Sequence, residues 1–258
     1  MRQPPTTQPH FFTWRRFRVS LADSQNDREQ VMRLRYEVFR QEWQGQGADG
    51  ESDADAFDPR CEHLMIRDSV GGELIGTYRF NPGSAASDFY TATEFVLGDF
   101  ACLPGALVEL GRACLRKDWR NNMAMIALGR AIAWYANTRG VDWFFGCSSL
   151  MAPTAHDAAL LACWFADHGH ILERAQPVRP VPAKRLPGFS EAVAAIDSWG
   201  PAHEARVQEL MAPLLRFYLA AGAKVAFEPS YDPEFGCVDF FTALDWKGAN
   251  AAFVRRYC

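Results

Sequence analysis

The segment Val108-Glu109-Leu110-Gly111-Arg112 places a carboxylate and a guanidinium inside an otherwise apolar stretch. Charged groups in apolar surroundings cost several kcal/mol unless they are paired, so they occur as ion pairs or as working groups. In a strand, Glu109 and Gly111 point to one face, and Leu110 and Arg112 point to the other. The glycine leaves space beside Glu109 for a bulge or a ligand backbone. Two interpretations stay open for the segment alone, a structural ion pair and a catalytic group.

The composition is that of a globular protein and excludes several classes. The 258 residues allow one large domain or two small ones, and 48% of them are hydrophobic. A net charge of −4 argues against a nucleic-acid partner, because such binders carry a basic face. The seven cysteines are scattered and never form a CxxC pair, which predicts neither a zinc site nor a disulfide framework and fits a reducing cytosol. No apolar stretch approaches the roughly 18 residues that span a bilayer.

Hydrophobic periodicity predicts a mixed α/β chain. After a Pro- and Gln-rich segment, 1–13, expected to be flexible, we expect a single domain over 14–258. Its sheet would be mixed, with helices on both faces. A capping box at Asn26 and Glu29 predicts where the first helix begins, and Pro213 predicts two helical pieces within 202–221. The strands are expected at 17–22, 63–67, 73–80, 107–115, 141–147, 224–228 and 237–246, and the helices at 26–43, 121–138, 154–166 and 202–221.

Two acidic or histidine-rich segments suggest metal sites, and we expect no metal at either. Asp53-x-Asp55-x-Phe57 lacks the third ligand and the glycine of a calcium loop. Asp53 is therefore interpreted as part of a solvated acidic loop. His168 and His170, two residues apart at a helix end, are more typical of a polar cap.

Six segments follow one another in the order and spacing of a known family, from about residue 17 to 246. They are Arg35-Tyr36-Glu37-Val38-Phe39, Phe57-Asp58-Pro59-Arg60-Cys61-Glu62-His63-Leu64, Gly76-Thr77-Tyr78-Arg79, Glu109-Leu110-Gly111-Arg112, Phe144-Phe145-Gly146-Cys147-Ser148-Ser149 and Tyr231-Asp232-Pro233-Glu234-Phe235-Gly236-Cys237-Val238-Asp239. Together they resemble the GNAT-superfamily N-acyltransferases of the ornithine-lipid-forming branch (hemolysin-like, L-ornithine N-alpha-acyltransferase). The acyl-homoserine-lactone synthases are a more distant likeness. The resemblance implies a GNAT fold, with a splayed strand pair that admits the pantetheine arm of the donor.

The resemblance also implies roles for charged residues. Glu109 matches the proposed catalytic base, which is useful because an amino acid's amine is mostly protonated at neutral pH. Arg112 and Arg79 match two arginines expected to pair with acidic residues, Glu109 among them, or to hold a substrate carboxylate.

The first helix and the acidic loop after it are expected to contribute to the same network. Arg35 is expected to join it, although an exposed helix arginine is an equally good interpretation of that residue alone. Asp55 and Asp58 are expected either to order the loop over the site or to receive a cationic substrate such as ornithine.

The donor site departs from the superfamily pattern. GNAT enzymes that use coenzyme A have a glycine-bearing loop whose backbone N–H groups bind the diphosphate. The corresponding segment here, 116–124, contains no glycine, but it carries Arg116, Lys117 and Arg120. These cations suit the single phosphate and the acidic surface of acyl carrier protein, and surface charge is the alternative interpretation. We expect an acyl-carrier-protein thioester as co-substrate and no cofactor.

The leading hypothesis is transfer of a long 3-hydroxyacyl chain from acyl carrier protein to the α-amine of an amino acid, most simply ornithine, which gives a lyso-ornithine lipid. One alternative keeps the fold but acylates glycine, tyrosine or another amine, or makes a homoserine lactone. The other is a non-catalytic scaffold that binds acyl carrier protein or a membrane. The expected location is the cytoplasm, with peripheral contact at the inner membrane face left open, because the aromatic and cationic run 14–18 fits an interfacial segment or an ordinary edge strand.

Overall fold

The computed structural model describes residues 11–45, 52–120, 122–151 and 154–257. They divide into two compact units. The first unit contains the chain up to Pro82 together with Leu110–Val141 and the last three residues, and the second contains Gly83–Glu109 and Asp142–Arg255. The single domain expected over 14–258 stays a prediction. Most of the segment 1–13 lies outside the described residues, but its last three residues belong to a strand rather than to a loose tail.

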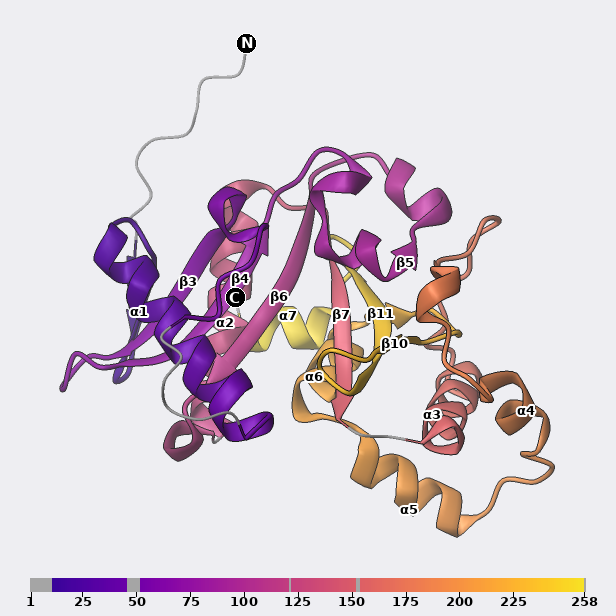
Figure 1. Ribbon diagram of the computed structural model, residues 1–258. Helices are drawn as coiled ribbons and strands as arrows, with labels where there is room; N and C mark the ends of the chain where they lie inside the picture. Colours follow the sequence, from indigo (N-terminus) through magenta and orange to yellow (C-terminus); the bar gives the residue numbers. More distant parts are fainter. Residues whose placement is uncertain (1–10, 46–51, 121, 152–153, 258) are drawn as a thin grey trace. The chain divides into compact units, whose positions relative to one another are not determined.

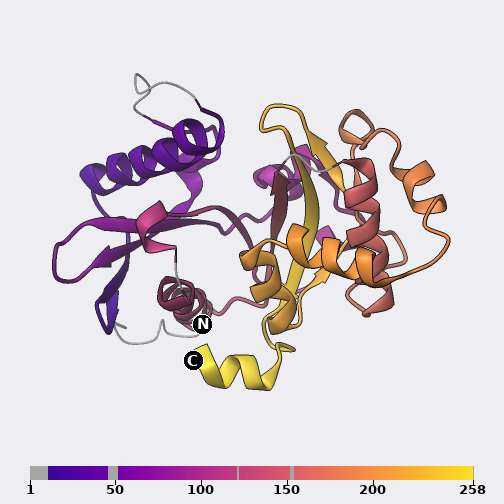
Figure 2. The ribbon, with the colours of Figure 1, turned by 90° about the horizontal axis from the view of Figure 1, so that it is seen from below.

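The first unit is a sheet with a helix on each face. Helix α1 packs on β3 and β4, and helix α2 packs on β2 and β3 from the opposite side (Figures 1 and 2). The strands follow the order β1-β2-β3-β4-β6, with β6 contributing its residues from Leu110 onward. The elements are β1 (Phe11–Trp14), β2 (Phe17–Leu21), β3 (Glu62–Asp68), β4 (Leu74–Asn81), β6 (Leu107–Leu115), α1 (Gln25–Arg35), which continues as a π-helix (Tyr36–Trp43), and α2 (Asn122–Arg139).

Local sequence explains where these helices begin and end. The Ser24 side chain accepts a hydrogen bond from the backbone N–H of Asp27 and caps α1, so the predicted capping box at Asn26 was wrong. The helical spacing of Val31, Leu34 and Val38 buries all three, as predicted. Helix α2 ends before Gly140, which has the positive φ (+67°) of a left-handed cap.

The second unit is built on the long strands β7 and β11, which pair antiparallel along their whole length. The first three residues of β6 run parallel to β7, and β10 forms a hairpin with β11. Its elements are β5 (Phe95–Val96), β7 (Trp143–Met151), β8 (Arg179–Pro180), β9 (Lys224–Val225), β10 (Ser230–Asp232), β11 (Cys237–Asp245), α3 (Ala155–Asp167), α4 (Phe189–Ala194), α5 (Pro201–Leu210), α6 (Pro213–Ala221) and α7 (Ala251–Tyr257).

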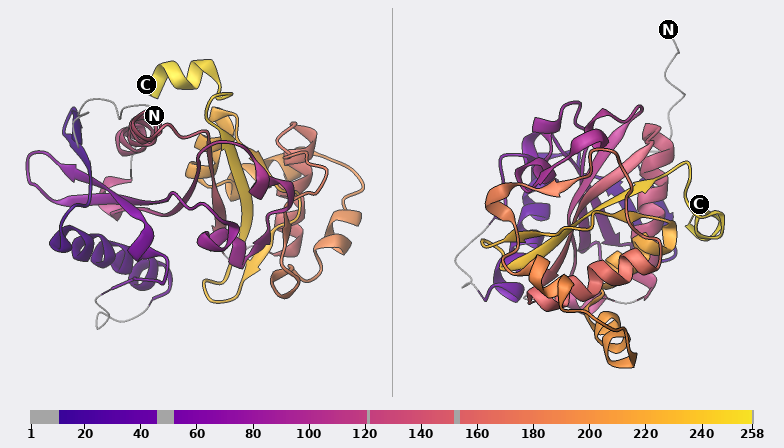
Figure 3. Two further views of the ribbon diagram at one scale, coloured as in Figure 1. Left: turned by 90° about the horizontal axis from the view of Figure 1, so that it is seen from above. Right: turned by 90° about the vertical axis from the view of Figure 1, so that its right-hand side faces the viewer.

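Strand β11 separates the two cores of this unit (Figure 3). Val238 and Phe240 pack with residues of α3, α5 and α6. Successive strand residues point to opposite faces, so Phe241 lies on the other side, where it packs with Phe89 and Phe95 from the segment of short 3-10 turns after Gly83. Cys237 and Asp239 lie on the same face of the strand as Phe241, so Asp239 lies on the side of the 3-10 turns.

Most predicted elements are confirmed, including the division of 202–221 into α5 and α6 before Pro213. The strand predicted at 224–228 is only two residues long, and β10 and α7 were not predicted. The mixed α/β class is confirmed, whereas the splayed strand pair stays a prediction. No helix in the described part of the chain is both long enough and apolar enough to span a membrane.

Candidate active site

Glu109 is held by backbone and hydroxyl donors of the second unit. Its side chain is buried, with 3% of the residue exposed. The backbone N–H of Tyr90 donates to Oε2 at 3.0 Å, and the N–H and hydroxyl of Thr91 both donate to Oε1 at 2.6 Å. These donors begin a 3-10 turn, Tyr90–Thr93. These three hydrogen bonds fix the position and orientation of the buried carboxyl group.

The predicted acidic-loop network is present in the first unit. Arg79 Nη1 lies 2.6 Å from Asp55 Oδ2 and 3.1 Å from Asp58 Oδ1. Arg35 Nη1 lies 2.7 Å from Asp58 Oδ1, and Arg35 is fully buried. The interpretation of Arg35 as an exposed helix arginine is therefore wrong. Burial of these charges is tolerable because each meets an opposite charge at hydrogen-bonding distance.

Asp53 belongs to the same network, so its interpretation as a solvated loop residue was also wrong. It is 4% exposed and accepts hydrogen bonds from Arg35 and from Arg40, both at 3.0 Å. The sequence offered no signal for this partnership, because Asp53 and Arg40 meet only when the loop folds back on the first helix.

Arg112 joins the network from a strained backbone position. Its Nη2 donates to Asp55 Oδ2 at 3.1 Å, and its φ is +53°, an uncommon value for a residue with a side chain. Such a conformation costs on the order of 1–3 kcal/mol and persists where the surroundings enforce it. The space above Gly111 borders the Arg79 guanidinium, since a Cβ added there would lie 3.7 Å from Arg79 Nη2.

The described part of the arginine cluster keeps its aspartates ionised. Burial alone would raise the pKa of Asp55, but Arg79 and Arg112 beside it outweigh burial and lower that pKa. The pKa of Asp58 is likewise lowered, burial being outweighed by Arg35 and Arg79. A guanidinium group of the cluster suits an anionic group better than an ammonium. The cluster has four arginines, Arg35, Arg40, Arg79 and Arg112, and three aspartates, Asp53, Asp55 and Asp58.

The predicted donor cations lie at the surface of the first unit. Arg116 contacts Glu73 and Asp118 at 3.1 and 3.2 Å. Arg120 holds Glu42 through both guanidinium ends, at 2.5 and 2.7 Å. Exposed pairs of this kind exchange readily, because each contributes only about 0–1 kcal/mol. Lys117 is exposed, and Asn121 lies outside the described residues.

Three backbone N–H groups of the segment 116–120 are hydrogen-bonded to carbonyl groups of the protein. The N–H of Arg116 donates to the Ile75 carbonyl, and those of Trp119 and Arg120 donate to carbonyls within the turn. Backbone donors already used in this way cannot also bind a diphosphate, so ligand attraction here depends on the side chains.

A second group of charged residues was missed by sequence reasoning. The Tyr90 hydroxyl donates to Glu94 Oε1 at 2.8 Å and lies 3.3 Å from Asp232 Oδ2. Lys184 Nζ lies 3.2 Å from Asp232 Oδ1, and Ser149 donates to Asp239. The two aspartates belong to the closing motif of the sequence, but no pattern singled out Glu94.

Comparison with known proteins supports the resemblance drawn from the motifs. Residues 34–130 match the family model described as an acetyltransferase (GNAT) domain. A protein of Brucella abortus (strain 2308) named L-ornithine N(alpha)-acyltransferase is 27% identical, over 93% of this chain and 88% of that protein. A protein of the same name from Rhizobium meliloti (strain 1021) is 28% identical, over 92% of this chain and 82% of its own length.

The fold also has a counterpart among solved structures. The crystal structure of TofI in a ternary complex with an inhibitor and MTA superposes with a TM-score of 0.51 at 15% identity. The match covers 93% of this chain and 97% of that one, so the likeness in fold extends beyond the segment matched by the family model. This chain is therefore an acyltransferase, similar over most of its length to the L-ornithine N(alpha)-acyltransferases, and its residues 34–130 match the GNAT domain model.

Proposed function

We propose that this protein transfers a long 3-hydroxyacyl chain from acyl carrier protein to the α-amine of ornithine and so forms a lyso-ornithine lipid. The likeness to two proteins named L-ornithine N(alpha)-acyltransferase, over more than nine-tenths of the chain, is the observation that carries the proposal. The buried, hydrogen-bonded carboxylate of Glu109 supplies the chemistry that such a transfer needs.

In the proposed reaction, the neutral α-amine attacks the thioester carbonyl. The C–N bond forms as the C–S bond breaks, the amine loses one proton, and the pantetheine thiol leaves in its protonated form. Glu109 accepts the proton from the attacking amine, directly or through water. No covalent acyl-enzyme is needed, so the nearby Cys147 has no nucleophilic role, and burial raises the pKa of its thiol.

A guanidinium group of the arginine cluster suits a substrate carboxylate. Arg79 and Arg112 both have the planar guanidinium fork that binds carboxylates. Asp55 and Asp58 hold these arginines in place. We therefore assign the two aspartates to ordering the loop and its arginines rather than to receiving the ornithine ammonium.

The proposed donor follows from the segment 116–120. Its backbone N–H groups at Arg116, Trp119 and Arg120 are used internally, and we assign the side chains of Arg116, Lys117 and Arg120 to attracting an acidic carrier protein and its single pantetheine phosphate. Because acyl carrier protein is the donor, we place the reaction in the cytoplasm, with its lipid product passing to the inner membrane face. The exposed Phe11 ring, with Arg18 stacked 4.4 Å from its centroid, is a candidate point of membrane contact.

The test is expression in a bacterial host that lacks ornithine lipids, followed by mass spectrometry of the lipid extract. The proposal expects a 3-hydroxyacyl-ornithine species that is absent from the empty-vector host. Acyl-glycine, acyl-tyrosine or acyl-homoserine lactone in its place would show that the enzyme acts on another acceptor. The absence of any acyl-amine would favour a binding scaffold.

A further inference from the structure

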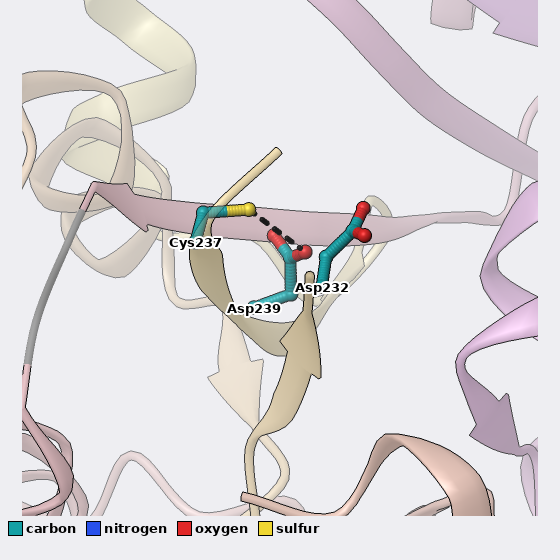
Figure 4. A group of neighbouring side chains, drawn as sticks. All are labelled: Asp232, Cys237 and Asp239. Atoms are coloured by element: carbon teal, nitrogen blue, oxygen red, sulfur yellow. Dashed lines mark hydrogen bonds between the residues drawn. The ribbon is translucent and has the colours of Figure 1, made fainter. Parts of the chain in front are cut away.

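The second unit contains a buried group of acidic residues that the proposed chemistry does not use. Asp232, Cys237 and Asp239 lie together on the hairpin of β10 and β11 (Figure 4), with their ligand atoms within 4.8 Å of one another. The hairpin register pairs Asp232 with Cys237 and Ser230 with Asp239, which places all four on one face of the sheet. The aspartates are 2% and 3% exposed.

A buried hydroxyl in this acidic pocket lacks a hydrogen-bond partner within the described part of the chain. It is the Oγ atom of the fully buried Ser230. Glu94, which is also fully buried, reaches the group from the turns above the sheet, where it shares a hydrogen bond with Asp239 and accepts one from Tyr90. Buried polar atoms are normally bonded, so Ser230 indicates a polar group that does not belong to the described residues.

The charges give the chemical nature of that group. Three acids, Glu94, Asp232 and Asp239, face one ammonium, that of Lys184, which contacts Asp232. Burial, together with the charges of Asp239 and Asp232, raises the pKa of Glu94, as expected when a buried acid has too few cations near it. Lys184 shows that an ammonium group is accepted at this place.

We propose that the acidic pocket formed by Glu94, Asp232 and Asp239 binds the side-chain ammonium of the acceptor amino acid and so selects ornithine over uncharged amino acids. This inference rests on the proposed N-acylation of an amino acid and adds the residues that recognise its side chain. An ammonium has three N–H donors, which match the acceptors Glu94 Oε2, Ser230 Oγ and an Asp239 oxygen.

The pocket and the candidate base are joined through one residue. The Tyr90 backbone N–H donates to Glu109, and its hydroxyl donates to Glu94 and contacts Asp232. The candidate base and the acidic pocket are therefore bridged by one tyrosine, from its backbone nitrogen to its hydroxyl oxygen. The two amines of ornithine are separated by a four-carbon chain of comparable length, so the α-amine can meet Glu109 while the far ammonium meets the acids.

A divalent metal fits the same residues less well. The Lys184 ammonium, 3.2 Å from Asp232, would repel a dication. Burial and the neighbouring acids raise the pKa of Cys237, which keeps it a neutral thiol, whereas metals bind the thiolate.

The experiment compares two acceptors that differ only in the far amine, ornithine and norvaline, with the wild type and with Glu94→Gln and Asp239→Asn. We expect wild-type kcat/KM to favour ornithine by at least about 10²-fold, because a site built for a buried polar group rejects an analogue that lacks it. Each variant should lose about 10-fold or more with ornithine and little with norvaline. The matched control is Glu234→Gln, an exposed acid of the same hairpin turn, which should leave the ratio unchanged.

The outcomes separate this inference from the proposed function. Acylation of both acceptors with a ratio near one, or equal losses for both in the variants, would overturn the pocket but leave the N-acyltransferase intact. Absence of any acylated amino acid would overturn the proposed function itself. If the variants do not fold, calorimetry on the wild type decides, since ornithine should bind with proton release near pH 8 and norvaline without it. Stoichiometric Zn²⁺ binding that excludes ornithine would assign the pocket to a metal.

Discussion

At the scale of single residues, the structural role of Glu109 must be separated from its proposed role as the base. Its Oε1 atom accepts two short hydrogen bonds from Thr91, so the side chain anchors the turn Tyr90–Thr93, which Glu94 follows. In the proposed reaction, the same carboxyl group accepts a proton from the amine. Loss of activity on mutation therefore has to be weighed against loss of structure.

Replacing Glu109 by Gln should lower kcat by about 10²-fold or more, the usual scale for loss of a general base. The glutamine amide would also face N–H donors, so a modest decrease in the melting temperature is expected. The measurement is steady-state acyl transfer together with thermal unfolding of the same preparation.

Thr91→Val is the matched control for the anchoring role. It removes the hydroxyl donor to Oε1 and retains the carboxylate, so it should lower stability by about 1 kcal/mol while most of the activity remains. If the two variants lose activity in proportion to their stability, Glu109 has only a structural role.

At the scale of elements, strand β6 and the turn after it carry the proposed base and the proposed donor-binding cations. The strand contributes Glu109 to the second unit and Arg112 to the first, and it continues into the turn Lys117–Trp119. That turn has no glycine, and the backbone N–H groups of Arg116, Trp119 and Arg120 are bound to protein carbonyls. The element thus offers side-chain cations in place of an anion-binding backbone.

Charge reversal in this turn should therefore affect the two possible donors differently. Changing Arg116, Lys117 and Arg120 to Glu should lower kcat/KM for acyl-carrier-protein thioesters by about 10-fold or more, because electrostatic steering is lost. The wild type should prefer the carrier-protein donor over the coenzyme A thioester, and added salt should reduce this preference as the Debye length falls from about 10 Å at 0.1 M to about 3 Å at 1 M. Equal kcat/KM for both donors, insensitive to salt and to the reversals, would rule out the proposed donor site.

At the scale of the whole molecule, buried acidic groups titrate differently in the two units. The arginine cluster of the first unit keeps Asp55 and Asp58 ionised, because it lowers their pKa. In the second unit, burial and neighbouring acids raise the pKa of Glu94 and Asp239. The second unit therefore contains buried acids that have too few cations near them.

The stability of the protein should depend on pH because the pKa of Glu94 in the acidic pocket is raised on folding. Between the unfolded pKa of about 4.5 and the folded value of about 8, the folded protein holds a proton on Glu94 that the unfolded chain does not. Stability from this group is therefore lost as pH rises through that window, by on the order of 1 kcal/mol or more. Thermal unfolding from pH 6 to 9 should show the decline in the wild type and a weaker one in Glu94→Gln. The charged and titratable groups around Glu94 that enter this balance are Tyr90, Cys147, Lys184, Asp232, Cys237 and Asp239.

Ornithine should counteract that decline. An ammonium in the acidic pocket replaces the proton on Glu94, so the stabilisation by ornithine should be larger at pH 8–9 than at pH 6. Norvaline should show no such dependence. Equal stabilisation by the two amino acids at every pH would contradict the assignment of the pocket.

Local sequence determined where many of the helices and strands of this protein lie. The periodicity of Val31, Leu34 and Val38 predicted the buried face of the first helix, and Gly140 marked the end of the second, because helix burial and left-handed caps depend on neighbouring residues. Glu109 could be selected from sequence because a carboxylate in an apolar strand is costly to bury. The strand 107–115 that carries it was predicted with its observed bounds.

Other features were decided only when distant segments met. Asp53 is buried because the acidic loop returns to Arg35 and Arg40, and composition alone suggested a solvated position for it. No pattern in the sequence singled out Glu94, and its neighbours in the acidic pocket come from strands β10 and β11, more than a hundred residues later in the chain. Local patterns determine which segments form helices and strands, whereas the charge balance of a buried site depends on which side chains the fold brings within a few ångströms. Coulombic interactions in a dry environment act through space rather than along the chain, so only the tertiary structure decided that one unit would gather arginines and the other acids.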